Sequence, residues 1–168
     1  MAKNLEIERK LLIAMPDEGV LEAMEGAACD EIVQTYLLAE AGVTARVRAR
    51  RGKRGVTYTA TEKRRLSDLT AIEDERELTE AEYLAMLSRR DPALRPIEKR
   101  RHTIPYAGQT LEIDIYPFWR QQAVLEIELP TEKTPLILPP FIKVIADVSG
   151  DRRYKNVSLA RLIPEESE

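Results

Sequence analysis

The chain has 168 residues, of which 43% are apolar and 33% charged, and its 26 Lys and Arg against 29 Asp and Glu give a formal net charge of −3. This size predicts one globular domain over residues 1–168, and the balanced charge argues against a nucleic-acid binder, which normally carries a basic surplus. One Cys and one His exclude intramolecular disulfides, Cys-based metal sites and a His-rich zinc site. Because no apolar run reaches signal-peptide or membrane-span length, we expect a reduced, cytoplasmic protein with no membrane partner.

Alternation of apolar and polar residues predicts eight strands along the chain. Their approximate ranges, in chain order, are about 3–14, 31–40, 43–51, 55–63, 71–78, 95–106, 109–117 and 122–129. Helices are predicted over about 17–26, over about 79–90, where Thr79 and Glu82 form a capping box, and near 156–162. Eight strands with few helices predict a mainly β, α+β domain built as an antiparallel barrel with peripheral helices.

The first predicted strand carries charge at every second position. Glu6, Glu8 and Lys10 fall on one face of it, because successive strand side chains point to opposite sides. The same alternation recurs in five more strands, as Arg46, Arg48 and Arg50; Glu73, Glu75 and Glu77; Lys99 and Arg101; Glu112, Asp114 and Tyr116; and Glu126 and Glu128. One such strand is most often a solvated face. Six in a small domain favour a barrel with a wet, charged interior and an apolar outer face packed against helices or a partner.

Such an interior would place hard oxygen ligands beside cations. The acidic candidates are Glu6, Glu8, Glu75, Glu77, Asp114, Glu126 and Glu128, and with no Cys or His among them they favour Mg²⁺ or Mn²⁺ over zinc. The basic candidates are Lys10, Arg46, Arg48, Lys63, Lys99 and Arg101, whose guanidinium and ammonium groups match phosphate oxygens. Both kinds in one cavity indicate metal-assisted phosphoryl transfer. His102 is expected to face away from Lys99 and Arg101.

The ordered series of motifs resembles that of CYTH-domain proteins, the triphosphate tunnel metalloenzymes. Glu6-Ile7-Glu8-Arg9-Lys10 matches their N-terminal Glu-x-Glu-x-Lys strand, and Gln34-Thr35-Tyr36-Leu37 resembles their Gln-Gly-Tyr-Leu strand. The later matches, in family order, are Arg46-Val47-Arg48, Glu75-Arg76-Glu77, Lys99-Arg100-Arg101, Leu111-Glu112-Ile113-Asp114, Glu126-Ile127-Glu128-Leu129 and the segment Ser149 to Asn156. The chain departs from the family pattern at Thr35, in place of Gly, at Glu62, in place of Val or Ile before Lys63, and at Asp147, in place of Glu.

The resemblance implies an eight-stranded tunnel with a triphosphate at its centre and Mg²⁺ or Mn²⁺ at two sites. It implies that the substrate is bound by Lys10, Arg46, Arg48, Lys63, Lys99 and Arg101. It implies that metal is held, directly or through water, by Glu6, Glu8, Glu75, Glu77, Asp114, Glu126 and Glu128. Lys10, Tyr36 and Lys99 are the residues assigned to catalysis, Tyr36 by orienting Lys10 or the leaving group.

The function implied by the resemblance is metal-dependent hydrolysis of inorganic tripolyphosphate to pyrophosphate and phosphate, as small bacterial members perform. Alternatives on the same fold are class IV adenylate cyclase and nucleoside, thiamine or RNA triphosphatases, although only two Phe and one Trp are present to build a nucleobase pocket. Outside enzymes, the alternatives are a polyphosphate-binding module and a charged barrel without ligand. The expected partner is a triphosphate-containing small molecule, and an apolar outer face would suit a homodimer.

Overall fold

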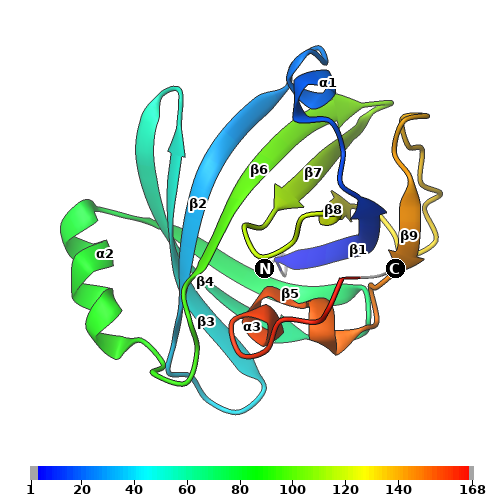
Figure 1. Cartoon of the computed structure of the whole chain (residues 1–168). Helices are drawn as coiled ribbons and strands as arrows, with labels where there is room; N and C mark the ends of the chain where they lie inside the picture. The colour runs from blue at the N-terminus through cyan, green and yellow to red at the C-terminus, as the bar shows by residue number, and fades with distance from the viewer. Residues whose placement is uncertain (1–3, 167–168) are drawn as a thin grey trace.

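The computed structural model describes residues 4–166 and shows a closed antiparallel barrel of eight strands with a ninth strand outside it (Figure 1). The barrel strands are β1 (Leu5–Ala14), β2 (Ala28–Leu37), β3 (Val43–Gly52), β4 (Gly55–Arg65), β5 (Thr70–Leu78), β6 (Ile97–Tyr106), β7 (Gln109–Ile115) and β8 (Gln122–Glu128). Their order is β5-β4-β3-β2-β6-β7-β8-β1, and a pairing between β1 and β5 closes the ring. The predicted eight-stranded, mainly β barrel is confirmed.

Three short α-helices lie outside the strands in this range. They are α1 (Glu18–Glu22), α2 (Glu80–Met86) and α3 (Asn156–Leu159), with 3₁₀ turns at Leu87–Arg89 and Arg152–Tyr154. The capping box predicted at Thr79 is present, because its hydroxyl accepts from the Glu82 N–H while the Glu82 carboxylate accepts from the Thr79 N–H. Among the described residues, no helix has the length and apolar character needed to cross a membrane.

The ninth strand, β9 (Val144–Asp147), was absent from the predicted elements. It pairs with Leu11–Ile13 on the edge of β1 whose earlier residues, Leu5–Ile7, pair with β5. Beyond β9 the Val148 N–H donates to the Lys10 carbonyl over 2.9 Å, and the Lys10 N–H donates to Ser149 Oγ over 2.9 Å. The chain after β9 therefore completes the barrel wall where the short pairing with β5 ends.

Helices and loops cover the apolar outer face of the barrel, as expected. Leu11, Ile113 and Leu125, from β1, β7 and β8, belong to a buried cluster that also contains Leu21 of α1. On the other side, Tyr83 of α2 packs in a cluster with Leu37, Val47 and Leu78, and its ring centroid lies 4.8 Å from that of Tyr58. Burial of the outer face explains why these strands carry apolar residues at alternate positions.

The inner face is apolar at one end of the barrel. Here the inward-facing Leu12, Tyr36, Ile97, Tyr116 and Val124 pack with Trp119, Val148, Tyr154 and Leu159 of the later segments. We call this group of nine residues the apolar plug. Figure 1 shows α3, which carries Leu159, in front of the barrel strands. The sequence predicted a charged interior, and the structure restricts the charge to the part of the lumen that the plug leaves open.

Candidate functional site

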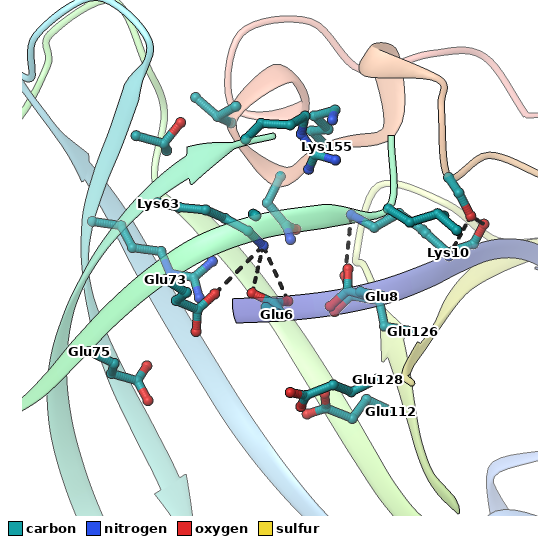
Figure 2. A pocket seen from close by; sticks show the side chains of 18 of the residues that line it. Glu6, Glu8, Lys10, Lys63, Glu73, Glu75, Glu112, Glu126, Glu128 and Lys155 are labelled. Atoms are coloured by element: carbon teal, nitrogen blue, oxygen red, sulfur yellow. Dashed lines mark hydrogen bonds and ion pairs between the residues drawn. The ribbon is translucent and has the colours of Figure 1, made fainter. Parts of the chain in front are cut away.

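A cavity of about 550 Å³ occupies the open part of the barrel interior (Figure 2). This volume falls within the roughly 300–1,000 Å³ of small-molecule sites. Among the described residues, eight basic side chains line it, namely Lys10, Arg46, Arg48, Arg50, Lys63, Arg65, Arg101 and Lys155. Eight acidic side chains line it as well, namely Glu6, Glu8, Asp68, Glu73, Glu75, Glu112, Glu126 and Glu128. Basic and acidic side chains are thus equal in number around the cavity.

Most of the residues singled out from the sequence meet in this cavity. Those that line it are Glu6, Glu8, Lys10, Tyr36, Arg46, Arg48, Lys63, Glu75, Arg101, Glu126 and Glu128. Three others do not line it. Lys99 and Asp114 are buried, with side chains fully shielded from solvent, and Glu77 is exposed near the end of β5. His102 faces away from this set, as expected, and its Nε2 lies 2.8 Å from Glu18 Oε1 of α1.

Several charged residues of the cavity were not among the candidate substrate and metal residues. Arg50, Glu73 and Glu112 were recognised as part of the alternating charged faces, now β3, β5 and β7, and strand periodicity was sufficient to include them in the site. Arg65 ends β4 two residues after Lys63, on the same face of the strand. Lys155 lies in the turn before α3, where no periodic pattern places a side chain, and it reaches the cavity because the C-terminal segment packs against the barrel.

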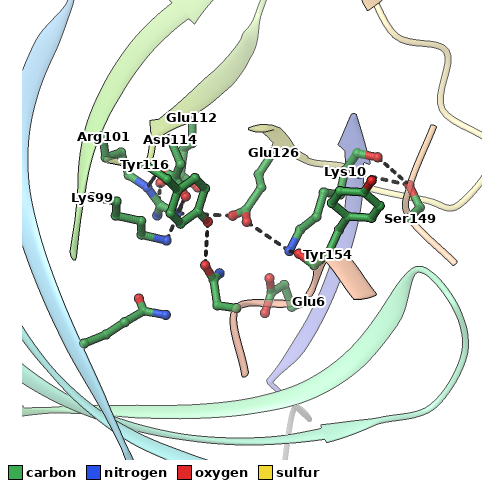
Figure 3. Close-up of polar contacts among 12 residues, drawn as sticks. Glu6, Lys10, Lys99, Arg101, Glu112, Asp114, Tyr116, Glu126, Ser149 and Tyr154 are labelled. Carbon is green, nitrogen blue, oxygen red and sulfur yellow. Dashed lines mark hydrogen bonds and ion pairs between the residues drawn. The ribbon is translucent and has the colours of Figure 1, made fainter. Parts of the chain in front are cut away.

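Lys99, Arg101 and Asp114 form a buried charged cluster beside the cavity (Figure 3). Asp114 Oδ1 accepts from Arg101 Nε over 2.7 Å, and Oδ2 accepts from Arg101 Nη2 over 2.8 Å and from Lys99 Nζ over 2.7 Å. Burial acts to raise the pKa of Asp114, but the positive charges of Arg101 and Lys99 hold it below its ordinary value. With both oxygens engaged, Asp114 orients Arg101 and Lys99 rather than presenting an open metal ligand.

Burial raises the pKa of an acid but lowers the pKa of a lysine. Removal of the ammonium from water therefore lowers the pKa of Lys99 to about 7, although the Asp114 carboxylate opposes the change. The Lys99 amine also lies 5.8 Å from the centroid of the Tyr116 ring, which belongs to the plug. Lys99 therefore sits at the boundary between the charged and apolar parts of the interior.

A chain of ion pairs runs from this cluster to the C-terminal segment. Arg101 Nη1 donates to Glu112 Oε2 over 2.7 Å, and Arg101 Nη2 donates to Glu126 Oε2 over 3.2 Å. The other oxygen of Glu126 lies 3.3 Å from Lys10 Nζ, which also donates to the Tyr154 carbonyl over 3.3 Å. Figure 3 shows Glu126 between Arg101 and Lys10. The orientation of Lys10 thus depends on both β8 and the C-terminal segment.

Two arginines of β3 lack carboxylate partners. Arg48 Nη2 donates to Gln34 Oε1 over 2.9 Å, and Gln34 Nε2 donates to the Tyr36 hydroxyl over 2.9 Å. Within residues 4–166, the Arg46 side chain makes no hydrogen bond or ion pair, and the Nε atoms of both arginines are buried without partners. A buried unpaired donor on a charged group costs free energy, so these two guanidinium groups are suited to an anion that enters the cavity.

The carboxylates of the cavity fit a divalent cation. Glu8 on β1 stands directly opposite Glu128 on β8, and burial together with the charge of Glu126 raises the pKa of Glu8 to about 8. At neutral pH the Glu8 carboxyl group therefore holds a proton, and a bound cation would replace that proton as the neutralising charge. In the described part of the chain, no three acidic, His or Cys side chains form a ready metal cage. Mg²⁺ commonly takes one or two carboxylates plus phosphate oxygens and water, so this all-oxygen set suits Mg²⁺ or Mn²⁺ bound with a phosphate.

No protein-family model matches the chain, and no curated protein is significantly similar to it. Among solved structures, it is similar to the inorganic triphosphatase NE1496, with 26% identity and a TM-score of 0.58 over 98% of this chain and 99% of that one. PH1819 from Pyrococcus horikoshii OT3 matches with 20% identity and a TM-score of 0.58 over 75% of this chain and 80% of its own.

A putative adenylate cyclase from Vibrio parahaemolyticus matches with 10% identity and a TM-score of 0.51, over 75% of this chain and 78% of that one. At 20% and 10% identity the likeness concerns the fold alone. The eight-stranded ring, the charged inward faces and the nearly full-length likeness to NE1496 lead to one conclusion. The chain has the CYTH, or triphosphate tunnel, fold.

Proposed function

We propose that this protein hydrolyses inorganic tripolyphosphate to pyrophosphate and phosphate, with Mg²⁺ or Mn²⁺ as cofactor. The observation that carries the proposal is the pair Arg46 and Arg48, whose Nε atoms are buried without partners and which share one cavity with Glu8 and Glu128. Such a cavity has cationic groups for phosphate oxygens and carboxylates for a divalent cation. The nearly full-length similarity to a protein named as an inorganic triphosphatase supports the same substrate.

The basic residues of the cavity bind the substrate and neutralise its charge in this reaction. Arg46, Arg48, Lys63 and Arg101 bind phosphate oxygens, and Lys10, held by Glu126 and the Tyr154 carbonyl, neutralises charge on the departing pyrophosphate. Water attacks the terminal phosphorus as the anhydride P–O bond breaks, a reaction in which positioning and charge stabilisation dominate catalysis.

The metal and the remaining residues act around this centre. Glu8 and Glu128, with Glu6 and Glu126 nearby, would hold the divalent cation, which when bound neutralises phosphate charge and lowers the pKa of a water. Lys99 acts through Asp114, which fixes the Arg101 guanidinium. Tyr36 receives the Gln34 hydrogen bond at the wall of the cavity and orients the neighbouring phosphate.

The cavity wall disfavours a nucleotide substrate. Among the described residues that line it, Tyr36 is the single aromatic, and it packs in the plug. A nucleobase would find no second ring on which to stack. Adenylate cyclase and nucleoside triphosphatase activities are therefore the second candidates, and a polyphosphate-binding module is the non-catalytic one.

Phosphate release from tripolyphosphate, ATP and thiamine triphosphate, each with Mg²⁺, Mn²⁺ or chelator, tests the proposal directly. We expect metal-dependent release from tripolyphosphate, with ATP far slower. Faster release from ATP or thiamine triphosphate would replace the proposed substrate. Tight tripolyphosphate binding without any release would favour a binding module, and formation of cyclic AMP from ATP would identify a cyclase.

Replacement of Glu128 separates catalysis from binding. Its carboxylate lines the cavity and, within residues 4–166, makes no ion pair or hydrogen bond, so Glu128→Gln removes a metal ligand without breaking a structural contact. We expect turnover of tripolyphosphate to fall by about 100-fold or more, because several kcal/mol of charge stabilisation depends on the metal. Tripolyphosphate affinity in chelator, measured by calorimetry, should stay within about threefold, since the arginines remain. Glu98→Gln, an exposed carboxylate on β6, is the control.

A further inference from the structure

One opening of the cavity carries two basic side chains that were not among the candidate residues predicted from the sequence. Gly42, Arg65, Asp68, Lys155 and Val157 line this opening, which we call the mouth. Arg65, Asp68 and Gly42 are exposed to solvent there, and a Cβ atom added to Gly42 would meet no heavy atom within 4 Å. In Figure 2, Lys155 and Lys63 lie on one side of the cavity, away from Glu75, Glu112 and Glu128. Lys63 is paired with Glu6 and Glu73. We call the far end of the cavity, where Glu75, Glu112 and Glu128 lie and Arg101 pairs with Glu112, the acidic end.

Neither cation of the mouth is neutralised by a carboxylate in the described part of the chain. Arg65 Nη1 donates to two backbone carbonyls of the β4–β5 turn, those of Ser67 over 3.2 Å and Asp68 over 2.8 Å, so its position is fixed while its charge is kept. The Lys155 amine makes no hydrogen bond or ion pair within residues 4–166. The one acidic side chain at the mouth is Asp68, whose carboxylate packs over Gly150.

The backbone on both sides of Lys155 is anchored. The Tyr154 side chain is buried in the plug and its carbonyl accepts from Lys10, while the Asn156 side chain accepts from the Tyr116 hydroxyl over 2.5 Å. Lys155 therefore projects from a rigid turn rather than from a loose tail. Partial burial and, after it, the positive charges of Arg65, Lys10 and Lys63 lower its pKa to about 8.

We propose that Arg65 and Lys155 form a phosphate subsite at the mouth that selects a substrate with free phosphates at both ends over one with an esterified end. This inference rests on the proposed function and adds a preference among triphosphate substrates to it. A linear triphosphate can direct only one terminal phosphate toward the acidic end, so the other lies at the mouth. A free terminal phosphate carries about −1.5 to −2 at pH 7, more than an esterified one, and two uncompensated cations favour that higher charge.

The test compares two substrates with two variants. Arg65→Gln and Lys155→Gln, singly and together, should lower kcat/KM for tripolyphosphate by about tenfold each, because each removes a charge-assisted contact. For ATP, whose outward end is the nucleoside, kcat/KM should change by no more than about threefold. Arg64→Gln is the matched control, since Arg64 is the neighbour of Arg65 on β4, is exposed and does not line the cavity.

Calorimetric binding of tripolyphosphate and ATP in chelator provides a second readout that needs no turnover. The inference predicts that both variants weaken tripolyphosphate binding more than ATP binding. Equal losses for the two substrates, or the same change in selectivity with Arg64→Gln, would overturn it. If wild type hydrolyses tripolyphosphate but selectivity does not depend on Arg65 and Lys155, this inference fails while the proposed function stands. If wild type neither binds nor hydrolyses tripolyphosphate, both fail.

Discussion

Two parts of one barrel interior differ in chemistry although the same strands line both. On β1, the inward-facing Glu6, Glu8 and Lys10 line the cavity, whereas Leu12, the next residue on that face, is 1% exposed inside the plug. On β8, Glu126 and Glu128 line the cavity while Val124 packs in the plug. Strand alternation decides which residues face inward, and the C-terminal segment decides which part of the lumen stays dry.

The plug also affects the charges next to it. The Tyr154 carbonyl accepts from Lys10, so the packed end positions a cation of the charged end, and Asn156 holds the C-terminal segment to Tyr116 within the plug. Excluding water from one side lowers the local dielectric constant and strengthens charge interactions at that boundary. The buried cluster of Lys99, Arg101 and Asp114 lies at this boundary, where the Lys99 amine is beside the Tyr116 ring.

Breaking the buried cluster is the most damaging change that we predict. Asp114→Asn removes the charge that both Lys99 and Arg101 contact, and we expect a loss of about 3–5 kcal/mol in the free energy of unfolding, as for other broken buried ion pairs. Urea denaturation at pH 7 measures it. Asp74→Asn, an exposed carboxylate on β5, should change stability by about 0.5 kcal/mol or less. Equal effects would mean that the cluster adds nothing beyond a surface pair.

Opening the plug should cost somewhat less. Leu159 is 1% exposed in the plug, and Leu159→Ala removes packed methyl groups, with an expected loss of about 2–5 kcal/mol in the free energy of unfolding. Leu162, three residues later, is 75% exposed, so Leu162→Ala serves as the matched control with little effect. Chemical denaturation of both variants measures the two losses. Similar midpoints would show that α3 does not seal the barrel.

The third predicted effect is a difference in pH dependence. The pKa of Glu8 is about 8 in the folded protein against an ordinary 4.5, so in chelator the folded state holds a proton that the unfolded state lacks. Stability from this group therefore falls as pH rises from about 4.5 to about 8. Lys99, with a pKa of about 7 against 10.5, acts in the opposite direction from about pH 7 to 10.5.

Glu8→Gln isolates the first of these two contributions. Between pH 5 and pH 8, the free energy of unfolding of Glu8→Gln should rise relative to that of wild type, measured by urea denaturation in chelator. Mg²⁺ should reduce the difference, because the cation replaces the proton. Parallel pH profiles for the two proteins in chelator would contradict the buried acidic pair of Glu8 and Glu126.

The sequence by itself determined the barrel and most of the cavity. Alternating side chains on β1, β3, β5, β6, β7 and β8 fix which charges share a face, because successive residues of a strand point to opposite sides whatever the rest of the chain does. Local capping chemistry likewise predicted where α2 begins, at Thr79. The ends of α1 and β2 were less well predicted, since helix and strand ends depend on neighbouring segments.

Only the tertiary structure decided how far into the barrel each inward residue lies. Lys99 and Asp114 share the alternation of Arg101 and Glu112, yet cross-strand register and packing of the plug bury them behind the cavity wall. The strand β9 and the position of Lys155 at the mouth depend on contacts with β1, more than a hundred residues earlier in the chain. Such pairings are set by non-local packing, and no periodicity within the segment itself encodes them.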